Sequence, residues 1–415
     1  MLTMRIEQTE NLTKVLFTKA HALCHAVNQI TKSSTHLDVI IGFNTGDIIW
    51  YEPMSQRYAR LNKNGMINRA AVADIQWLPG SENLFIAAHM DGSLVVYDKE
   101  KEDAAFVPEE VEMVEAVRSG SPRLKVLKSV ASDKQKTNPV AAYKLSNQKP
   151  NALSFSPSGA HLAIASEDGC LRIIDLHAER LVDVYMSYYG GLLCVTWSPD
   201  GRYILTGGQD DLVSIWSFEE GGLVARCAGH RSWVVDVRFD VWRCDERNYR
   251  FGSVGEDARL LLWDFSVGML HRPRAASVRQ VYTGMGHARG GSVSTKNIMS
   301  QESLAKVESA EVEDGEGDAE QILHPVEPRA RTAQLPPVMA RCVDNHGLSW
   351  LGFEEDAIVT ACRDGEFDTF LTIACTSYCF VASGTTGLSD TATGSLVIAA
   401  NGYRILHHRL EHTIT

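Results

Sequence analysis

The stretch LCVTWSPDGRYILTGGQDDLVSIWSF, from Leu193 to Phe218, decides the fold of this chain. It contains a short apolar run that ends in Trp-Ser-Pro, a second run that ends in an acidic turn, and a third apolar run. Runs of this length, bounded by turn residues, predict three successive β-strands. The same order recurs from Ala152 to Leu176, from Val235 to Phe265 and, less regularly, from Ala73 to Asp98. Repetition of one unit of roughly 40 residues predicts an architecture in which each unit packs against its neighbours.

The spacing inside the unit is constant. In each repeat an acidic residue of the turn precedes an aromatic or aliphatic residue of the third strand by six positions: Asp91 and Tyr97, Asp168 and Ile174, Asp210 and Trp216, Asp257 and Trp263. This content is typical of WD40 repeats, whose four-stranded sheets are the blades of a β-propeller. The sequence therefore predicts an all-β chain that folds as a WD40 β-propeller.

A polar network is expected in these blades. In WD repeats the turn acid accepts a hydrogen bond from a His of the preceding loop, and a Ser or Thr links this His to the Trp. One repeat has the complete set of His230, Ser253, Asp257 and Trp263. The repeat before it keeps Thr206, Asp210 and Trp216 but has Gly190-Gly191 where the Gly-His pair is expected. Since buried polar networks fix geometry when all members are paired, we interpret these residues as structural rather than catalytic.

Two weaker repeats raise the number of recognisable blades to six. Leu37 to Glu52 aligns on the turn, with Thr45 in place of the acid and Tyr51 in place of the Trp. Its first strand is expected between Val15 and Val27. Leu348 to Gly365 gives a further blade, with Thr360 and Asp364 in register, after which Glu366 to Phe370 is only an approximate third strand.

Two segments interrupt the repeats, and we expect both to be long disordered insertions. They run from about residue 99 to 138 and from about 272 to 335. In the second, the part between Gln301 and Gln321 has eight acidic residues and a single Lys306. One-sided charge with low hydrophobicity does not offset the entropy of ordering. This part is either a plain solvated loop or a regulatory segment open to phosphorylation.

The predicted domain organisation follows from these boundaries. Residues 1–12 form an irregular N-terminus, residues 13–370 the propeller with its insertions, and residues 371–415 a C-terminal tail without the repeat pattern. Within the tail, Ser395 to Ala400 (SLVIAA) is apolar enough to pair with an open sheet edge.

Composition restricts the class of protein. The 415 residues carry a net charge of −12 without a basic stripe, which argues against nucleic acid as the main partner. No run of 18 apolar residues predicts a membrane span, and the first 25 residues lack the apolar core of a secretory signal. The nine cysteines form no paired framework, as expected in a reducing compartment. We therefore expect a cytoplasmic or nuclear location.

The chain shows little sign of catalytic or metal chemistry. The segment Gly284 to Gly290 (GMGHARG) resembles a phosphate-binding loop but has no predicted strand before it or helix after it. Cysteines and histidines of the tail do not have a zinc-binding spacing: Cys375, Cys379, His407, His408 and His412. We expect no enzyme activity, no cofactor, no metal and no small-molecule ligand.

Three runs carry a more specific resemblance. Gly42 to Pro53 (GFNTGDIIWYEP), Trp77 to Ala104 (WLPGSENLFIAAHMDGSLVVYDKEKEDA) and Ser187 to Trp216 (SYYGGLLCVTWSPDGRYILTGGQDDLVSIW) resemble the fungal CreC family of catabolite repression proteins. They are also similar to animal WD-repeat proteins that activate ubiquitin-specific proteases. The resemblance covers about residues 13 to 365 and implies a non-enzymatic partner of a deubiquitinase, which in fungi acts in carbon catabolite repression.

The chain departs from that family at both ends. Relatives have a longer N-terminal region that supplies another blade, and they continue the turn at Asp364-Gly365 into a strand that ends in Trp. The family resemblance implies seven blades, so we expect this ring to lack one blade and to leave a sheet edge open. Open edges invite aggregation.

The resemblance also implies where a protease binds. The matching positions are an aromatic before Gly-Gly-Leu-Leu and the Trp of His-x-Ser-Trp, which here are Tyr189, with Tyr188 beside it, and Trp233. We expect neighbouring blades to set Tyr189 and Trp233 side by side on one face. Surrounding them we expect a polar rim of Arg231, Glu167, Gln209, Asp211 and Glu256. The alternative is that these aromatics pack against the adjacent blade.

Two functional classes remain open from the sequence. One is an activating or stabilising scaffold of a deubiquitinase. The other is a substrate adaptor for another ubiquitin or signalling complex. Adaptors of phosphorylated clients need several Arg or Lys around the central channel, whereas the turns of this chain are rich in Asp and Glu. This difference favours the first class.

Overall fold

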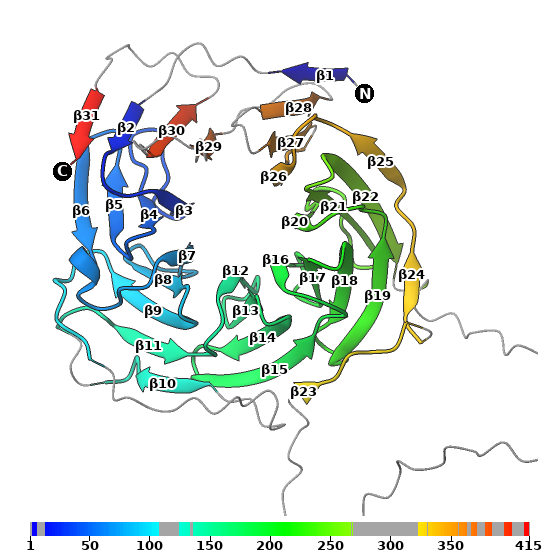
Figure 1. The fold of residues 1–415 in the computed structure, drawn as a ribbon, viewed down its shortest axis with the longest axis horizontal. Helices are drawn as coiled ribbons and strands as arrows, with labels where there is room; N and C mark the ends of the chain where they lie inside the picture. Colours follow the sequence, from blue (N-terminus) through cyan, green and yellow to red (C-terminus); the bar gives the residue numbers. More distant parts are fainter. Residues whose placement is uncertain are drawn as a thin grey trace, which may run out of the picture. The chain divides into compact units, whose positions relative to one another are not determined.

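The computed structural model describes residues 2–5, 13–107, 124–132, 136–266, 268, 323–329, 331–355, 357–362, 367–371, 378–383, 394–400 and 411–414. These residues belong to a compact unit formed by Met1–Leu270 and Ile322–Thr415. Apart from one 3-10 turn, η1 (Lys63–Gly65), its elements are strands, which form seven sheets. The sheets are arranged about a common centre (Figure 1), and the prediction of an all-β propeller is confirmed. Within the described residues, no helix is long and apolar enough to cross a membrane.

Each sheet is treated as one blade, numbered I to VII. Blade I consists of β3 (Ala22–Val27), β4 (Val39–Phe43), β5 (Ile48–Glu52) and β6 (Arg57–Leu61). Blade II consists of β7 (Val72–Trp77), β8 (Leu84–His89), β9 (Ser93–Asp98), β11 (Ala141–Lys144) and, at its outer edge, β10 (Lys125–Lys128). Blade III consists of β12 (Pro150–Phe155), β13 (His161–Ser166), β14 (Cys170–Asp175), β15 (Arg180–Met186) and the outer β23 (Leu323–His324).

The remaining blades follow the same order. Blade IV consists of β16 (Leu192–Trp197), β17 (Tyr203–Gly208), β18 (Leu212–Ser217), β19 (Gly222–Ala228) and the outer β24 (Ala333–Leu335). Blade V consists of β20 (Val234–Phe239), β21 (Asn248–Gly255), β22 (Arg259–Ser266) and β25 (Met339–Cys342). Blade VI consists of β26 (Leu348–Phe353), β27 (Ala357–Cys362), β28 (Phe367–Leu371) and β1 (Leu2–Arg5).

Blade VII has no counterpart among the six repeats recognised in the sequence. Its sheet has the order β29 (Tyr378–Ser383), β30 (Gly394–Ala400), β2 (Thr13–Phe17) and β31 (Glu411–Ile414). The expectation that the ring lacks a blade is therefore wrong, because β30 and β31 both pair with β2. Strand pairing uses backbone N–H and C=O groups, so a tail without the blade pattern can complete a sheet.

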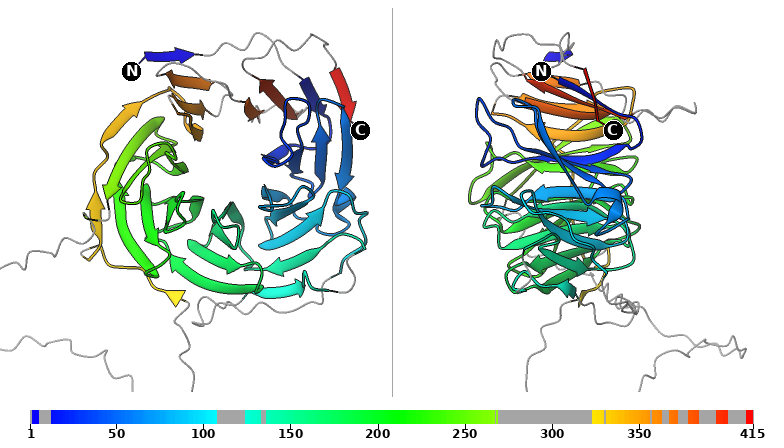
Figure 2. Two further views of the ribbon diagram at one scale, coloured as in Figure 1. Left: turned by 180° about the vertical axis from the view of Figure 1, so that it is seen from behind. Right: turned by 90° about the vertical axis from the view of Figure 1, so that its left-hand side faces the viewer.

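The N-terminus also differs from the expected irregular segment. Strand β1 pairs antiparallel with β28 and is the fourth strand of blade VI, as Figures 1 and 2 show. Strands from the N-terminal and the C-terminal parts of the chain thus combine in both blade VI and blade VII. The first strand of blade I is β3, inside the expected range, whereas Val15 and Phe17 belong to blade VII.

The ends of both insertions form strands, contrary to the expectation that the insertions are disordered throughout. Both lie between the third and fourth strands of a blade, in blade II between β9 and β11 and in blade V between β22 and β25. The first insertion contributes β10, and the second contributes β23 and β24, which pair parallel with β15 and β19. An outermost strand has unpaired backbone groups along its edge, which a short polar segment can satisfy. The acidic part from Gln301 to Gln321 lies outside the described residues.

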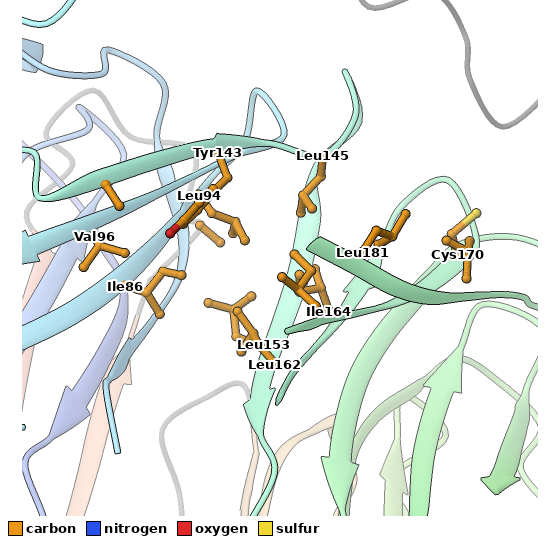
Figure 3. Packing of buried hydrophobic residues seen from close by; sticks show 14 of the residues in the cluster. Ile86, Leu94, Val96, Tyr143, Leu145, Leu153, Leu162, Ile164, Cys170 and Leu181 are labelled. Atoms are coloured by element: carbon orange, nitrogen blue, oxygen red, sulfur yellow. The ribbon is translucent and has the colours of Figure 1, made fainter. Parts of the chain in front are cut away.

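The core consists of apolar layers between neighbouring blades. Figure 3 shows Ile86, Leu94, Val96 and Tyr143 of blade II opposite Leu153, Leu162, Ile164 and Leu181 of blade III. Equivalent layers lie between other neighbouring blades, for example Tyr203 and Leu205 of blade IV against Phe251 and Trp263 of blade V. Both faces of a blade are buried in this way, which explains why the third strands read as continuous apolar runs.

Side chains of the first strands link successive blades. At the third position of four first strands stand Cys24, Asp74, Cys194 and Asp236. Cys24 and Cys194 each donate to a carbonyl of the next blade, Val72 O and Val234 O, at 3.8 Å. Asp74 and Asp236 accept the backbone N–H groups of Leu153 at 2.7 Å and Leu351 at 3.1 Å. The sequence analysis missed these links, although an acid within an apolar strand is a recognisable signal.

Asp74→Asn is expected to flatten the pH dependence of stability. Burial raises the pKa of Asp74 to about 6, against roughly 3.9 in an unfolded chain. The folded state therefore holds this proton more tightly, so the stabilisation is largest below about pH 4 and is lost as the pH rises through about 6. An Asn oxygen still accepts the Leu153 amide. Between about pH 4 and pH 7 the variant should gain roughly 2 kcal/mol on the wild type in urea unfolding.

The control for this prediction is Asp264→Asn, because the Asp264 side chain is 41% exposed. Its unfolding free energy should follow that of the wild type across the same pH range. If the wild type and Asp74→Asn give parallel curves, Asp74 does not hold its proton in the folded state.

Candidate partner-binding face

One hydrogen bond recurs in blades II to V and defines a face of the propeller. The first amide of the turn after the second strand donates to a carbonyl in the loop before the first strand. The pairs are Met90 N to Ala71 O (2.8 Å), Glu167 N to Lys149 O (2.8 Å), Gln209 N to Gly191 O (2.9 Å) and Glu256 N to Trp233 O (3.0 Å). We call these loops and turns together the turn face. The bond also aligns the blades, so residues of different loops can be compared position by position.

Blade V contains the complete network that the sequence predicts. His230 Nδ1 lies 3.0 Å from Asp257 Oδ1, His230 Nε2 lies 2.8 Å from Ser253 Oγ, and Trp263 Nε1 donates to Ser253 Oγ at 2.9 Å. Because a carboxylate only accepts, Nδ1 carries the proton and Nε2 accepts from the Ser253 hydroxyl. Burial lowers the pKa of His230, although Asp257 has the opposite effect. The lowered pKa keeps the ring neutral.

Asp257 also holds the backbone on both sides of the network. Its carboxylate accepts the N–H of Arg231 at 2.9 Å and the N–H of Arg259 at 3.2 Å. The loop that carries Arg231 and Trp233 is therefore fixed from within the blade. These contacts confirm the arrangement expected for His230, Ser253, Asp257 and Trp263.

Blades II and III pair their turn acids differently. In blade II the position of His230 is taken by Asn68, which donates to Asp91 Oδ2 at 3.2 Å and Ser93 Oγ at 2.7 Å. In blade III the donor comes from the third strand. Arg172, which is 1% exposed, donates to both carboxylate oxygens of Asp168 at 3.1 and 2.6 Å and to Ser166 Oγ at 3.2 Å. The sequence analysis missed Arg172, although a lone Arg in the apolar run CLRIID was a signal.

Blade IV departs from the sequence-based alignment. In blade V, His230 lies three residues before Trp233, whose carbonyl accepts the turn amide. The corresponding carbonyl of blade IV belongs to Gly191, so Tyr188, and not Gly190-Gly191, takes the position of His230. Trp216 Nε1 still donates to Thr206 Oγ1 at 2.9 Å, as predicted. Asp210 accepts from Leu212 N at 3.2 Å, and burial raises its pKa to about 6. The sequence-based alignment of this loop was shifted by three positions, because strand starts are known only within a few positions from sequence.

The candidate aromatics of the turn face are exposed. Tyr189 is 74% exposed, and Tyr188 and Trp233 are each 44% exposed. Gly191 N in the Tyr189 loop donates to Gln209 Oε1 of the blade IV turn at 2.9 Å. The Trp233 loop directly precedes β20 of blade V. Tyr188 is different, because its ring lies 4.7 Å from the guanidinium of Arg226.

Two of the residues expected in the polar rim, Gln209 and Glu167, are hydrogen-bonded to each other. Gln209 Nε2 donates to Glu167 Oε1 at 2.8 Å, which connects the turns of blades III and IV, and Asn151 Nδ2 donates to Glu167 Oε2 at 2.8 Å. Asp211 has a left-handed backbone with φ of 61°. Arg231 is exposed. Among the residues expected in the rim, acidic groups outnumber basic ones.

Several predicted residues cannot be placed. Asp364 and the segment Gly284 to Gly290 lie outside the described residues, as do Cys375, His407 and His408. Cys379 and His412 lie in strands whose side chains are not described. Within the described part of the chain, no group of three or more His, Cys, Asp or Glu residues is arranged to hold a metal ion.

Comparisons with known proteins agree with this picture. The family model of the WD domain, G-beta repeat, matches residues 139–175 and 181–217, which lie in blades II to IV. The UBP9-binding protein bun62 of Schizosaccharomyces pombe is 41% identical over 367 residues, which cover 86% of this chain and 66% of that protein. The chain thus spans about two thirds of the length of this relative. The chain is also similar to the crystal structure of the computationally designed Ika8 protein. The match covers 85% of this chain and 71% of the Ika8 chain, with 12% sequence identity and a TM-score of 0.46.

Proposed function

We propose that this chain, a WD40-repeat β-propeller protein, is a non-enzymatic scaffold that binds a ubiquitin-specific protease through its turn face. The observation that carries the proposal is the 41% identity to a protein named as UBP9-binding. Identity at this level over 86% of the chain supports transfer of the kind of partner.

The aromatics of the turn face are the proposed contacts. Tyr189 and Trp233 are exposed on loops that hydrogen bonds hold to their blades, so little ordering is needed on binding. Exposed aromatics at the centre of an interface commonly contribute about 2 kcal/mol or more to affinity. The rim acids Glu167, Asp211 and Glu256 favour a partner surface that is basic around an apolar centre, which speaks against an adaptor of phosphorylated clients.

Binding of this kind can activate or stabilise the protease. A scaffold shifts a protease toward its active conformation only as far as it binds that conformation more tightly than the inactive one. The resemblance to the CreC family supports carbon catabolite repression as the process served in fungi. Seven cysteines in the described part of the chain are free thiols, which supports the proposed cytoplasmic or nuclear location.

A Tyr189→Ala, Trp233→Asp double variant is expected to weaken binding of the ubiquitin-specific protease of the same organism by roughly 30-fold or more. The aspartate adds charge to an already acidic face, and the alanine removes the most exposed ring. Affinity is measured by titration calorimetry, and ubiquitin cleavage is measured with and without the propeller protein. The rise in cleavage rate should disappear together with binding.

Trp242→Asp is the matched control. Trp242 is 53% exposed and follows the end of β20, whereas Trp233 precedes its start, so the two indoles belong to opposite ends of one strand. The control should bind as the wild type does. Equal loss in both variants would mean a general folding defect, and absence of binding by monodisperse wild-type protein would contradict the proposal. Capture of a phosphorylated client instead would favour the adaptor class.

A further inference from the structure

The end of the long insertion pairs with two blades before it enters a third. Strand β23 pairs with blade III and β24 with blade IV, and the chain then enters β25 of blade V. We call residues 323–329 and 331–335 together the strap. Figure 1 shows β23 and β24 along the outer strands β15 and β19.

The strap is held by side chains as well as by strand pairing. His324 Nε2 lies 2.7 Å from Asp183 Oδ1, and its ring stacks on Tyr185 with centroids 4.5 Å apart. Leu323 and Leu335 pack against the apolar clusters that lie between the blades. These contacts tie the strap to blades III and IV at both of its ends.

The centre of the strap is bound by Arg226 of β19. Arg226 is 2% exposed and donates from Nη1 to Thr332 Oγ1 at 3.1 Å and from Nη2 to Glu327 O at 2.8 Å. Its Nε–H has no hydrogen-bond acceptor among the described residues. A buried guanidinium that keeps an unpaired N–H is costly, so a compensating contact is expected.

That contact is the ring of Tyr188. The Arg226 guanidinium carbon lies 4.7 Å from the Tyr188 centroid, within the range of a cation–π interaction. Tyr188 occupies the position at which His230 turns into blade V and reaches Asp257. In blade IV the ring instead stays 44% exposed on the turn face and rests on Arg226.

We propose that Arg226 is a positioning residue for Tyr188, and that the strap, by fixing the Arg226 guanidinium, makes the end of the long insertion a determinant of the turn face. The effect on partner binding rests on the function proposed above. The effect on the Tyr188 ring does not, because it is a property of the free protein. The two can therefore be measured separately.

The first experiment follows the Tyr188 ring in the free protein. Tyrosines are nitrated with tetranitromethane, and the rates at Tyr188 and Tyr189 are determined by mass spectrometry. In Arg226→Met the rate at Tyr188 should rise toward that of Tyr189, because one face of the ring is uncovered, while Tyr189 itself should not change. Thr332→Val, which removes one acceptor of Arg226 and keeps the side-chain shape, should produce a smaller rise.

Arg172→Met is the matched control. Arg172 is as buried as Arg226, but it donates to Asp168 and Ser166 of its own blade. Its loss should lower the melting temperature without changing nitration at Tyr188. Unchanged nitration at Tyr188 in both Arg226→Met and Thr332→Val would overturn the proposal. If Arg226→Met does not fold, the nitration rate of Tyr188 in Thr332→Val decides the test alone.

The second experiment is a double-mutant cycle on protease affinity. Arg226→Met should weaken binding roughly three- to thirty-fold in the wild-type background and should have no further effect in Tyr188→Ala. Arg226→Lys should not restore binding, because an ammonium group lacks the planar guanidinium that stacks on the ring and reaches two acceptors. Additive effects of Arg226→Met and Tyr188→Ala would contradict positioning through Tyr188. If the wild type binds no protease, the proposed function fails, and nitration alone decides the role of Arg226.

Discussion

Asp257→Ala is expected to lower the free energy of unfolding by about 3 to 5 kcal/mol, a large part of the stability of a typical domain. The carboxylate accepts three N–H groups, from the His230 ring and from the Arg231 and Arg259 backbones. His230 is 8% exposed, so its Nδ1–H cannot turn to bulk solvent once Asp257 is removed. Each buried donor left unpaired costs about 1 to 3 kcal/mol.

Urea unfolding followed by tryptophan fluorescence measures this loss. Asp264→Ala in the same blade is the control, because its ion pair with Arg250 is partly exposed, with side chains 35% and 41% accessible, and should be worth about 1 kcal/mol or less. A destabilisation by Asp257→Ala no larger than that of Asp264→Ala would mean that the network contributes nothing to stability.

Asp168→Ala should have an effect of similar size, by a different route. The change leaves the guanidinium of Arg172 buried in blade III with only Ser166 as a side-chain acceptor. Breaking a buried ion pair by removing one partner typically costs about 3 to 5 kcal/mol, because the remaining charge is not compensated. Thermal and urea unfolding of Asp168→Ala should both show this loss.

The combined variant Asp168→Ala, Arg172→Met separates the cost of the orphaned charge from the value of the pair. Replacement of both partners by apolar groups is often close to neutral, so most of the lost stability should return. A double variant as unstable as Asp168→Ala alone would show that the destabilisation comes from the turn and not from the buried charge.

The turn acids of blades II, III and V meet three different side-chain donors, and this difference bears on function. His230 and Asn68 come from the loop before the first strand, and Arg172 comes from the third strand. In blade IV no side-chain donor reaches Asp210 among the residues that the structure describes, and Tyr188 contacts Arg226 instead. A local departure from the structural rule at the proposed binding face is what is expected where a position serves binding rather than stability.

The sequence by itself determined the blade architecture, the position of most strands and the complete network of blade V. Repeats such as Leu193 to Phe218 carry local information, because turn residues, strand periodicity and the six-residue spacing all lie within one blade. Tyr189 and Trp233 were singled out by the family resemblance, and both are exposed in the structure.

Only the tertiary structure decided what depends on contacts between distant parts of the chain. The seventh blade joins β2 to β30 and β31 through backbone bonds that leave no side-chain pattern. The position of Tyr188 in the blade register depended on one loop hydrogen bond, Gln209 N to Gly191 O. Arg226 meets Thr332 across 106 positions of sequence. Such contacts arise because strand edges and buried charges are satisfied by whatever group the fold brings near, and sequence distance does not limit that choice.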